Sequence, residues 1–249
     1  MKDISTLLDT PYGRVIVAKH DRNQTGHLLE HGRAWSHDDI VMLTDLGRQC
    51  GEGAVCVDIG ANFGLFSLAW GRALEETGGT VLCVEGQRIL AYMICGSVML
   101  NNLENVHVYN VCMGGNMGAI QIPQYDYTQS ANFGSVEFRT VSIDTGQSPQ
   151  PNRSEEVVPL ITLDSLELSR VDVIKIDAEG MEEEIIAGGL KTLSTHHPIL
   201  FLEWIKSDKS ALIAAVKALG YNVYDHGFDI MCFHPTRFPE FQATLGVKL

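Results

Sequence analysis

Short apolar runs recur along the chain, and most of them end at an acidic residue or a glycine. The clearest run, 55–59, is followed by a glycine turn at 60–64 and then by 65–70, where the apolar residues have helical spacing. A short apolar run closed by glycine is typical of a buried parallel strand. The segment 55–70 is therefore predicted to form a strand, a tight turn and a helix, the opening unit of an open α/β sheet.

The same alternation continues through the rest of the sequence. It predicts further strands at 13–18, 80–86, 106–112, 171–177, 198–204, 221–224 and 230–234, and helices at 38–48, 89–101, 182–193 and 210–219. Strands that alternate with helices favour right-handed crossovers onto a mostly parallel sheet. We therefore expect an α/β fold, with a mostly parallel seven-stranded sheet and helices on both faces.

Two regions do not follow this rhythm. Residues 115–158 contain β-like pieces, among them 133–140, and a loop rich in Pro, Gln and Ser at 144–154. We interpret this stretch as a β-rich insertion after the third strand. Residues 1–50 are interpreted as an N-terminal extension with a lid-like loop. The remainder, 51–249, is long enough for one domain with a full core, and we expect it to form one.

The glycine turn has an informative spacing, Asp-x-Gly-x-x-x-Gly, with Asp58 before Gly60 and Gly64. The two glycines permit a tight turn and the close approach of a ligand to bare backbone. A carboxylate at Asp58 would repel a pyrophosphate but suits a ligand that carries an amine or a sulfonium cation. S-adenosylmethionine carries both. The alternative is an ordinary strand-to-helix turn capped by Asn62.

Four of the predicted strands end in an acid, namely Asp58, Glu85, Asp177 and Glu203. Ligands of open α/β sheets bind at the carboxyl ends of the strands, and the acid after the second strand binds the ribose of a cofactor. Glu85 follows Asp58 at about the separation of one strand–helix–strand unit. Like charges gathered at one edge cost stability unless a ligand or hydrogen bonds compensate them, which favours a functional site.

Composition narrows the possible partners and the compartment. The 249 residues carry a formal net charge of −13, which argues against binding to nucleic acid or to an anionic membrane surface. No apolar run has the length of a membrane span, and the first residues lack the core of a signal peptide, so we expect a cytoplasmic protein. The six cysteines form no C-x-x-C pair, which favours free thiols over a disulfide or zinc framework.

With these motifs, the chain resembles the FkbM family of S-adenosylmethionine-dependent methyltransferases. The resemblance runs from about residue 20 to residue 234 and includes the segments 57–64, 84–86, 132–134, 161–166, 175–180, 202–203 and 231–232. The glycine turn marks the whole methyltransferase superfamily. The Lys-Ile-Asp-x-Glu-Gly motif at 175–180, with Asn-Phe-Gly at 132–134 before it, is specific to this family.

The resemblance implies a Rossmann-like class I methyltransferase fold and methyl transfer from S-adenosyl-L-methionine, often to a hydroxyl of a sugar or natural product. The acceptor would be a small molecule or glycan, and the resemblance implies no metal. We expect the cofactor to bind at Asp58, Gly60, Ala61, Asn62, Phe63, Gly64, Glu85, Gly86 and Asn132, with the Asn-Phe-Gly segment beside the methyl donor. The expected catalytic residues are Asp177, Glu179 and Glu203.

Asp177 is the first candidate for the group that accepts the acceptor's proton, because it ends the strand beside the topological switch point. Glu179 and Glu203 would shape the acceptor pocket and hold its hydroxyls. The alternative is that Asp177 only caps the following turn by accepting backbone N–H bonds at Gly180 and Met181.

One departure from the family pattern lies in the N-terminal loop. Many relatives carry Gly-Glu-(Tyr/Trp)-Ser, whereas this chain reads Arg-Ala-Trp-Ser at 33–36, so the glutamate is absent. His37 or Asp38 could replace it. The acceptor of relatives therefore does not transfer directly to this chain.

Three other functions stay open from the sequence. A nicotinamide-dependent oxidoreductase would share the sheet, but the glycine spacing and the absence of a Tyr-x-x-x-Lys pair argue against it. A non-catalytic S-adenosylmethionine-binding protein could use the insertion as a partner surface. A metal enzyme could use the oxygens of Asp177, Glu179 and Glu203, although no regular metal-loop spacing is present. Neither the methylated atom nor the acceptor follows from the sequence, and an oligomer is possible.

Overall fold

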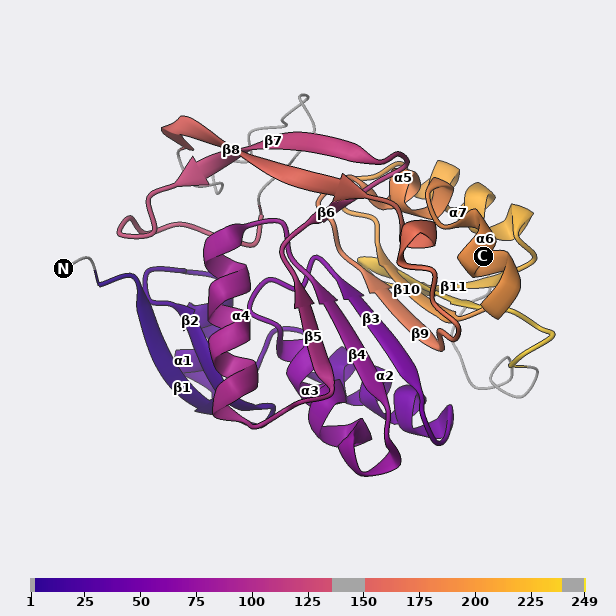
Figure 1. The fold of residues 1–249 in the computed structure, drawn as a ribbon, viewed down its shortest axis with the longest axis horizontal. Coiled ribbons are helices and arrows are strands. Elements are labelled where there is room, and N and C mark those ends of the chain that lie inside the picture. The colour runs from indigo at the N-terminus through magenta and orange to yellow at the C-terminus, as the bar shows by residue number, and fades with distance from the viewer. Residues whose placement is uncertain (1–2, 136–150, 239–248) are drawn as a thin grey trace.

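A single twisted sheet of seven strands organises the computed structural model, which describes residues 3–135, 151–238 and 249 (Figure 1). The strand order is β11-β12-β10-β9-β3-β4-β5. The strands are β3 (Val55–Ile59), β4 (Thr80–Val84), β5 (Val106–Tyr109), β9 (Val173–Ile176), β10 (Ile199–Glu203), β11 (Asn222–His226) and β12 (Asp229–Phe233). Neighbours from β10 to β5 pair in parallel, whereas β12 is antiparallel to both β10 and β11. The predicted α/β sheet is confirmed.

Helices cover both faces of this sheet because both faces of its strands are apolar. Along β3, Cys56 packs into one core and Val57 into the other, as the alternation of a strand requires. The first core holds α2 (His37–Gln49), α3 (Leu65–Leu74), α4 (Arg88–Leu100) and the hairpin of β1 (Ser5–Thr10) and β2 (Gly13–Ala18). The second holds α5 (Glu182–Ala187), α6 (Leu190–His196) and α7 (Lys209–Ala218).

A second, three-stranded sheet lies above the upper end of the main sheet in Figure 1. Its strands are β6 (Cys112–Met113), β7 (Gly118–Tyr125) and β8 (Pro151–Ile161), in the order β6-β8-β7. The remaining elements of the described residues are the helix α1 (Gln24–His31) and the short helices η1 (Glu75–Thr77) and η2 (Leu163–Leu166). Most of the predicted 133–140 and 144–154 segments falls on residues 136–150, outside the described residues. Residues 151–154, predicted as loop, belong to β8.

The predicted helix 182–193 is wrong, because the chain forms two helices with Gly188 and Gly189 between them. A Cβ at Gly188 would lie 2.2 Å from the Gly114 carbonyl oxygen, and one at Gly189 would lie 2.7 Å from Leu163. This close packing requires glycine, and the helix breaks there. The predicted strand 106–112 is also divided, since its last residue, Cys112, opens β6. The helix α1 and the strand β1 were not predicted.

All six cysteines lie in the described part of the chain and are free thiols, as predicted, although Cys95 is exposed. Among the described residues, no helix is both long and apolar enough to cross a membrane.

Candidate active site

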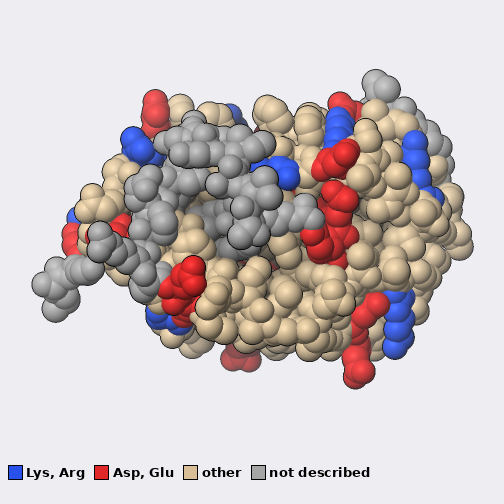
Figure 2. All heavy atoms as spheres, turned by 90° about the horizontal axis from the view of Figure 1, so that it is seen from above, with Lys and Arg blue, Asp and Glu red and all other residues tan. Residues whose placement is uncertain are grey.

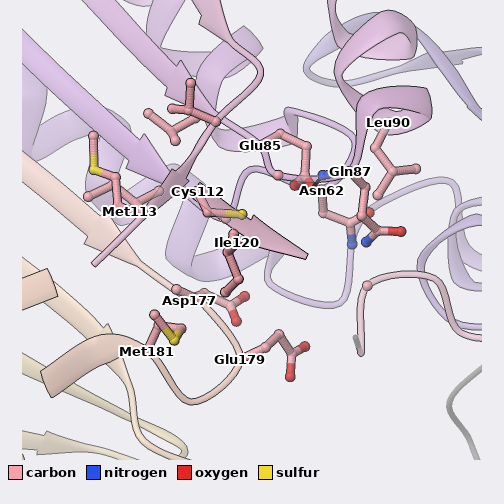
Figure 3. Close-up of a pocket in the computed structure, with 17 residues that line it drawn as sticks. Asn62, Glu85, Gln87, Leu90, Cys112, Met113, Ile120, Asp177, Glu179 and Met181 are labelled. Carbon is pink, nitrogen blue, oxygen red and sulfur yellow. Dashed lines mark hydrogen bonds between the residues drawn. The ribbon is translucent and has the colours of Figure 1, made fainter. Parts of the chain in front are cut away.

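A pocket, which we call the inner pocket, lies where the strands β3, β4 and β9 end (Figure 3). Its volume is about 620 Å³, counting the part open to solvent. In Figure 3, Glu85 and Asn62 lie on one side and Asp177 and Glu179 on another. Its lining is Ile59, Gly60, Asn62, Val84, Glu85, Gly86, Gln87, Leu90, Val111, Cys112, Met113, Ile120, Gly134, Asp177, Ala178, Glu179 and Met181.

Glu85 is a buried carboxylate fixed at the wall of the inner pocket. One oxygen accepts the backbone N–H of Asn62 at 2.9 Å, and the other accepts that of Gln87 at 2.7 Å. Burial raises the pKa of Glu85 to about 7, against the two backbone N–H donors, which lower it. Each oxygen keeps further acceptor capacity, so the carboxylate can receive hydroxyl donors from a ligand.

The glycine turn serves the packing of the protein itself. Gly60 has φ of +75°, and a Cβ there would lie 1.8 Å from the carbonyl oxygen of Asp177. A Cβ at Gly64 would lie 3.0 Å from the side chain of Ile94 on α4. The two glycines therefore let the turn pack against the end of β9 and against α4. The sequence predicts that a ligand approaches the backbone at Gly64, but Ile94 fills the space beside this glycine.

Four of the predicted cofactor residues, namely Asp58, Ala61, Phe63 and Gly64, support the inner pocket from behind and do not line it. Phe63 and Ala61 belong to the first core. Asp58 is completely buried, accepts the Ser67 hydroxyl at 2.7 Å and lies 3.3 Å from the Lys175 ammonium. The Asp58 carboxylate is thus paired with a cation of the protein itself, Lys175, whereas the sequence predicts a cation of the ligand as its partner.

Asn62 reaches the inner pocket from a left-handed backbone conformation, with φ of +54°. Its side-chain Oδ1 is buried and has no hydrogen-bond partner among the described residues. A buried acceptor without a partner costs free energy, and a ligand donor would satisfy it.

The Asn-Phe-Gly segment is clamped into this site by two residues that sequence reasoning missed, Asp21 and Gln87. Asp21 accepts the N–H of Phe133 at 3.0 Å, and the Gln87 side chain donates to the Phe133 carbonyl at 2.8 Å. Asp21 lies three residues after the end of β2, and Gln87 lies two residues after Glu85. These positions close to predicted strand ends are the sequence signal for the two residues. Phe133 is buried and stacks on Tyr127.

A second hollow, called the outer pocket here, adjoins the inner one. It is lined by Asn23, Gln24, Trp35, Ser36, Asn62, Asn132, Gly134, Ser135, Asp177, Glu179, Glu203, Ile205 and Lys206. Four residues line both pockets, namely Asn62, Gly134, Asp177 and Glu179. We call these four the shared wall. The predicted residue Asn132 thus lies in the outer pocket, and the predicted residues Glu85 and Gly86 lie in the inner one.

The three predicted catalytic acids all line the outer pocket. The Asp177 side chain is 38% exposed and lies 3.6 Å from the Lys175 ammonium. Burial and then the Asp177 charge raise the pKa of Glu179 to about 8, although Glu179 is paired with Lys206. The same two causes raise the pKa of Glu203 to about 10. Figure 2 shows acidic side chains gathered on the face seen from above.

The turn after Asp177 is capped by a different residue, Glu182. Its buried carboxylate accepts the N–H groups of Ala178 and Gly180, and the Met181 N–H donates to the Ala178 carbonyl. The capping role considered for Asp177 is therefore filled by Glu182, and Glu179 adopts a left-handed conformation, with φ of +54°, within the turn.

His37, considered as a replacement for the missing family glutamate, lies away from both pockets. Its Nδ1 is 2.8 Å from the Tyr12 hydroxyl, and it lines a separate groove. Trp35 and Ser36 of the same segment reach the outer pocket instead. Among the described residues, no group of three or more His, Cys, Asp or Glu side chains has the arrangement to hold a metal ion.

The main sheet is mostly parallel and has seven strands, with one antiparallel strand near its edge. A glycine turn follows its first core strand, and an acid follows the next. Together these features define a Rossmann-like S-adenosyl-L-methionine-dependent methyltransferase fold. The model of the methyltransferase FkbM domain matches residues 58–223, about two thirds of the chain. The chain therefore belongs to the FkbM family of methyltransferases, enzymes with S-adenosyl-L-methionine as cofactor.

Solved methyltransferases are similar in structure to this chain at low sequence identity, which shows the fold alone. A methyltransferase FkbM from Methylobacillus flagellatus is 17% identical with a TM-score of 0.50, and the match covers 74% of this chain and 44% of that one. This chain thus spans less than half the length of that protein. A search of curated proteins found no significant match.

Two further solved structures have lower TM-scores. Precorrin-6y C5,15-methyltransferase from Geobacter metallireducens is 16% identical, with a TM-score of 0.45 over 80% of this chain and 88% of that one. The tRNA (uracil-54, C5)-methyltransferase from Pyrococcus abyssi, solved with S-adenosyl-L-homocysteine, is 12% identical, with a TM-score of 0.44 over 92% of this chain and 43% of that one.

The inner pocket has the groups that S-adenosyl-L-methionine needs. Glu85 offers carboxylate oxygens for the ribose hydroxyls, and the unpartnered Oδ1 of Asn62 offers an acceptor for a ligand donor. Apolar side chains suited to enclosing the adenine base also line the pocket, namely Leu90, Val111, Met113 and Ile120. The residues present therefore fit the cofactor.

Proposed function

We propose that this chain transfers the methyl group of S-adenosyl-L-methionine to a hydroxyl of a small acceptor, such as a sugar or a natural product. One observation carries the proposal: the inner and outer pockets meet at the shared wall of Asn62, Gly134, Asp177 and Glu179. A donor in one pocket and an acceptor in the other would face each other there. Such placement is the main requirement of a direct displacement.

In this proposal the inner pocket is the donor site. Glu85 holds the ribose hydroxyls, and Gly86 lies beside it in the lining. The cofactor supplies an electrophilic methyl group on a sulfonium. The cofactor residues that do not line the pocket act indirectly: Asp58, Ala61, Phe63 and Gly64 fix the turn that carries Gly60 and Asn62.

The outer pocket is the acceptor site, and Asp177 is its base. Asp177 would take the proton of the acceptor hydroxyl as its oxygen receives the methyl group, and S-adenosyl-L-homocysteine would be the other product. With their pKa raised to about 8 and about 10, Glu179 and Glu203 are protonated at neutral pH, so each can donate a hydrogen bond to an acceptor oxygen.

A small acceptor fits the charges of this site better than a nucleic acid does. The outer pocket carries three acids against Lys206, and the whole chain has a net charge of −13. The negative net charge of the chain would repel the phosphates of a nucleic acid. A neutral polyol can use the acids as donors and acceptors, and the exposed ring of Trp35 at the pocket offers a flat apolar surface.

The test is turnover measured as S-adenosyl-L-homocysteine released in the presence of a panel of hydroxylated sugars, glycans and polyketide-like alcohols. Binding of S-adenosyl-L-homocysteine to the same protein is measured by calorimetry. We expect tight binding together with product formation on at least one hydroxylated acceptor, located by mass spectrometry. Binding without turnover on any acceptor would favour a non-catalytic cofactor-binding protein, and methylation of only a nitrogen or carbon atom would contradict the hydroxyl assignment.

A further inference from the structure

Lys175 is a buried cation beside the two pockets. It lies in the middle of the sheet on β9, with a side chain only 5% exposed. Its ammonium donates to the Gly60 carbonyl at 2.8 Å, and it lies 3.3 Å from Asp58 and 3.6 Å from Asp177. An ammonium has three N–H donors, and here it has three oxygen neighbours.

The register of the sheet explains why these groups meet. Asp58 on β3 and Lys175 on β9 are direct partners in the parallel ladder, so their side chains lie on the same face. Asp177 follows two residues later on that face, at the end of the strand. The ring of Phe66, from α3, covers the ammonium at 5.5 Å. Solvent therefore does little to screen these interactions.

The three neighbours of Lys175 belong to the two halves of the proposed reaction site. Gly60 lies in the turn that lines the inner pocket, Asp58 precedes this turn on β3, and Asp177 belongs to the shared wall. We infer that Lys175 is a positioning residue that fixes the donor-side turn and the Asp177 carboxylate relative to each other. This inference about Asp177 rests on the proposed function, whereas its donor-side part does not.

The charges support a fixed geometry. Burial disfavours the Lys175 cation, but the Asp58 and Asp177 carboxylates outweigh this effect and raise the pKa of Lys175. The side chain therefore stays charged across the working range of pH. If Lys175 only balanced the buried Asp58, the contacts with Gly60 and Asp177 would not matter to the reaction, and this difference can be measured.

Replacing Lys175 alone would leave the Asp58 charge buried without a cation and threaten folding. The test therefore uses an Asp58→Asn background, into which Lys175→Met is introduced, so that one buried cation and one buried anion are removed together. Thermal unfolding confirms that both variants fold. Lys19→Met, which removes a lysine paired with Asp3 at the surface, is the matched control and should leave binding and turnover unchanged.

The first measurement is the affinity for S-adenosyl-L-homocysteine by calorimetry. Adding Lys175→Met to Asp58→Asn should weaken binding by about three- to tenfold, because the Gly60 carbonyl loses its donor and the turn is less fixed. This measurement needs no acceptor. If the wild-type protein proves to have no turnover, the proposed function fails, but unchanged affinity would still contradict the role of Lys175 and weakened affinity would still support it.

The second measurement is a double-mutant cycle on kcat with the acceptor found for the wild-type protein. With Asp177 present, Lys175→Met should lower kcat by roughly tenfold to a hundredfold, and with Asp177→Asn it should lower kcat less than about twofold further. An equal loss in the two backgrounds would show that Lys175 acts on folding or packing alone. No loss in either background would also overturn the inference.

Discussion

The inner and outer pockets are adjacent, but they are built in different ways. The inner pocket is formed mainly by the ends of β3, β4 and β9 and the residues that follow them, and its carboxylate Glu85 is held by two backbone N–H groups. Leu90, Ile120 and Gly134 complete its lining. The outer pocket draws on segments far apart in sequence: the N-terminal segment with Trp35, the Asn-Phe-Gly segment, and the residues after β9 and β10.

This difference separates a site that the main sheet holds in place from a site that depends on loops. A site made by backbone and strand ends changes only if the sheet changes, so it suits the constant substrate, the methyl donor. A site made by loops can change its side chains at little cost to the fold, so it suits the acceptor. The two pockets meet at the shared wall, where the proposed reaction would take place. The following predictions test this division.

The largest expected effect is on the shared wall. Asp177→Asn keeps the shape of the side chain but removes the base, so kcat should fall by roughly 10²–10⁴-fold. Because Asp177 does not contact Glu85, the affinity for S-adenosyl-L-homocysteine should change little. The measurements are steady-state kinetics on the true acceptor and calorimetry. Near-full turnover in this variant would place the base elsewhere, at Glu179, Glu203 or a histidine.

The next effect concerns the donor side alone. Glu85→Ala removes hydrogen bonds to ribose worth roughly 1.5–3 kcal/mol each, so binding of S-adenosyl-L-homocysteine should weaken at least about tenfold. Since the pKa of Glu85 is raised to about 7 and ribose hydroxyls donate best to the ionised form, wild-type affinity should rise between pH 6 and pH 8. Glu85→Gln, which cannot ionise, is the control and should lose this pH dependence. Unchanged affinity in the alanine variant would remove Glu85 from the site.

A smaller effect is expected on the acceptor side. Trp35 is 68% exposed and lines the outer pocket. Trp35→Ala should raise the KM for the acceptor about three- to tenfold, through lost stacking area, and leave donor affinity unchanged. Phe228→Ala removes an equally exposed ring that lines neither pocket and is the matched control. Equal effects of the two variants on KM would show that Trp35 is not at the acceptor site.

The last predicted effect is on stability and not on binding or turnover, and it depends on pH. The folded-state pKa of Glu203, raised to about 10 mainly by burial, lies above its ordinary value of 4.5. The folded protein therefore holds a proton that the unfolded chain releases, and this contribution to stability is lost as pH rises from about 4.5 towards 10. Glu203→Gln cannot ionise at this position and does not lose this stability. The difference between its unfolding temperature and that of the wild-type protein should therefore shift in favour of the variant from pH 6 to pH 9. Glu104→Gln, at an exposed position, should show no such gain. A gap that stays constant with pH would contradict the raised pKa.

The sequence predicts the main sheet and part of the inner pocket, namely Gly60, Asn62, Glu85 and Gly86, because both depend on local signals. Apolar runs closed by acids place Glu85, Asp177 and Glu203 at strand ends, and the structure brings them to adjoining pockets. The division of the 182–193 helix could not be predicted, because it depends on contacts of Gly188 and Gly189 with distant residues.

The roles of single polar residues are harder to predict than their positions. The sequence predicts that Asp58 faces a ligand, but Asp58 pairs with Lys175 across the β3–β9 strand pair and so has a partner within the protein. Glu182, which looks like an ordinary helix-opening acid, caps the turn after β9. In each case the partner comes from tertiary pairing, which a single sequence does not specify.

The most direct test of the account is a crystal structure with S-adenosyl-L-homocysteine bound. We predict the ribose hydroxyls within hydrogen-bond distance of Glu85, the adenine among the apolar residues of the inner pocket, and the sulfur at the shared wall, facing Asp177 and the outer pocket. A ligand whose sulfur points away from Asp177, or whose ribose lies away from Glu85, would contradict the assignment of the two pockets to donor and acceptor.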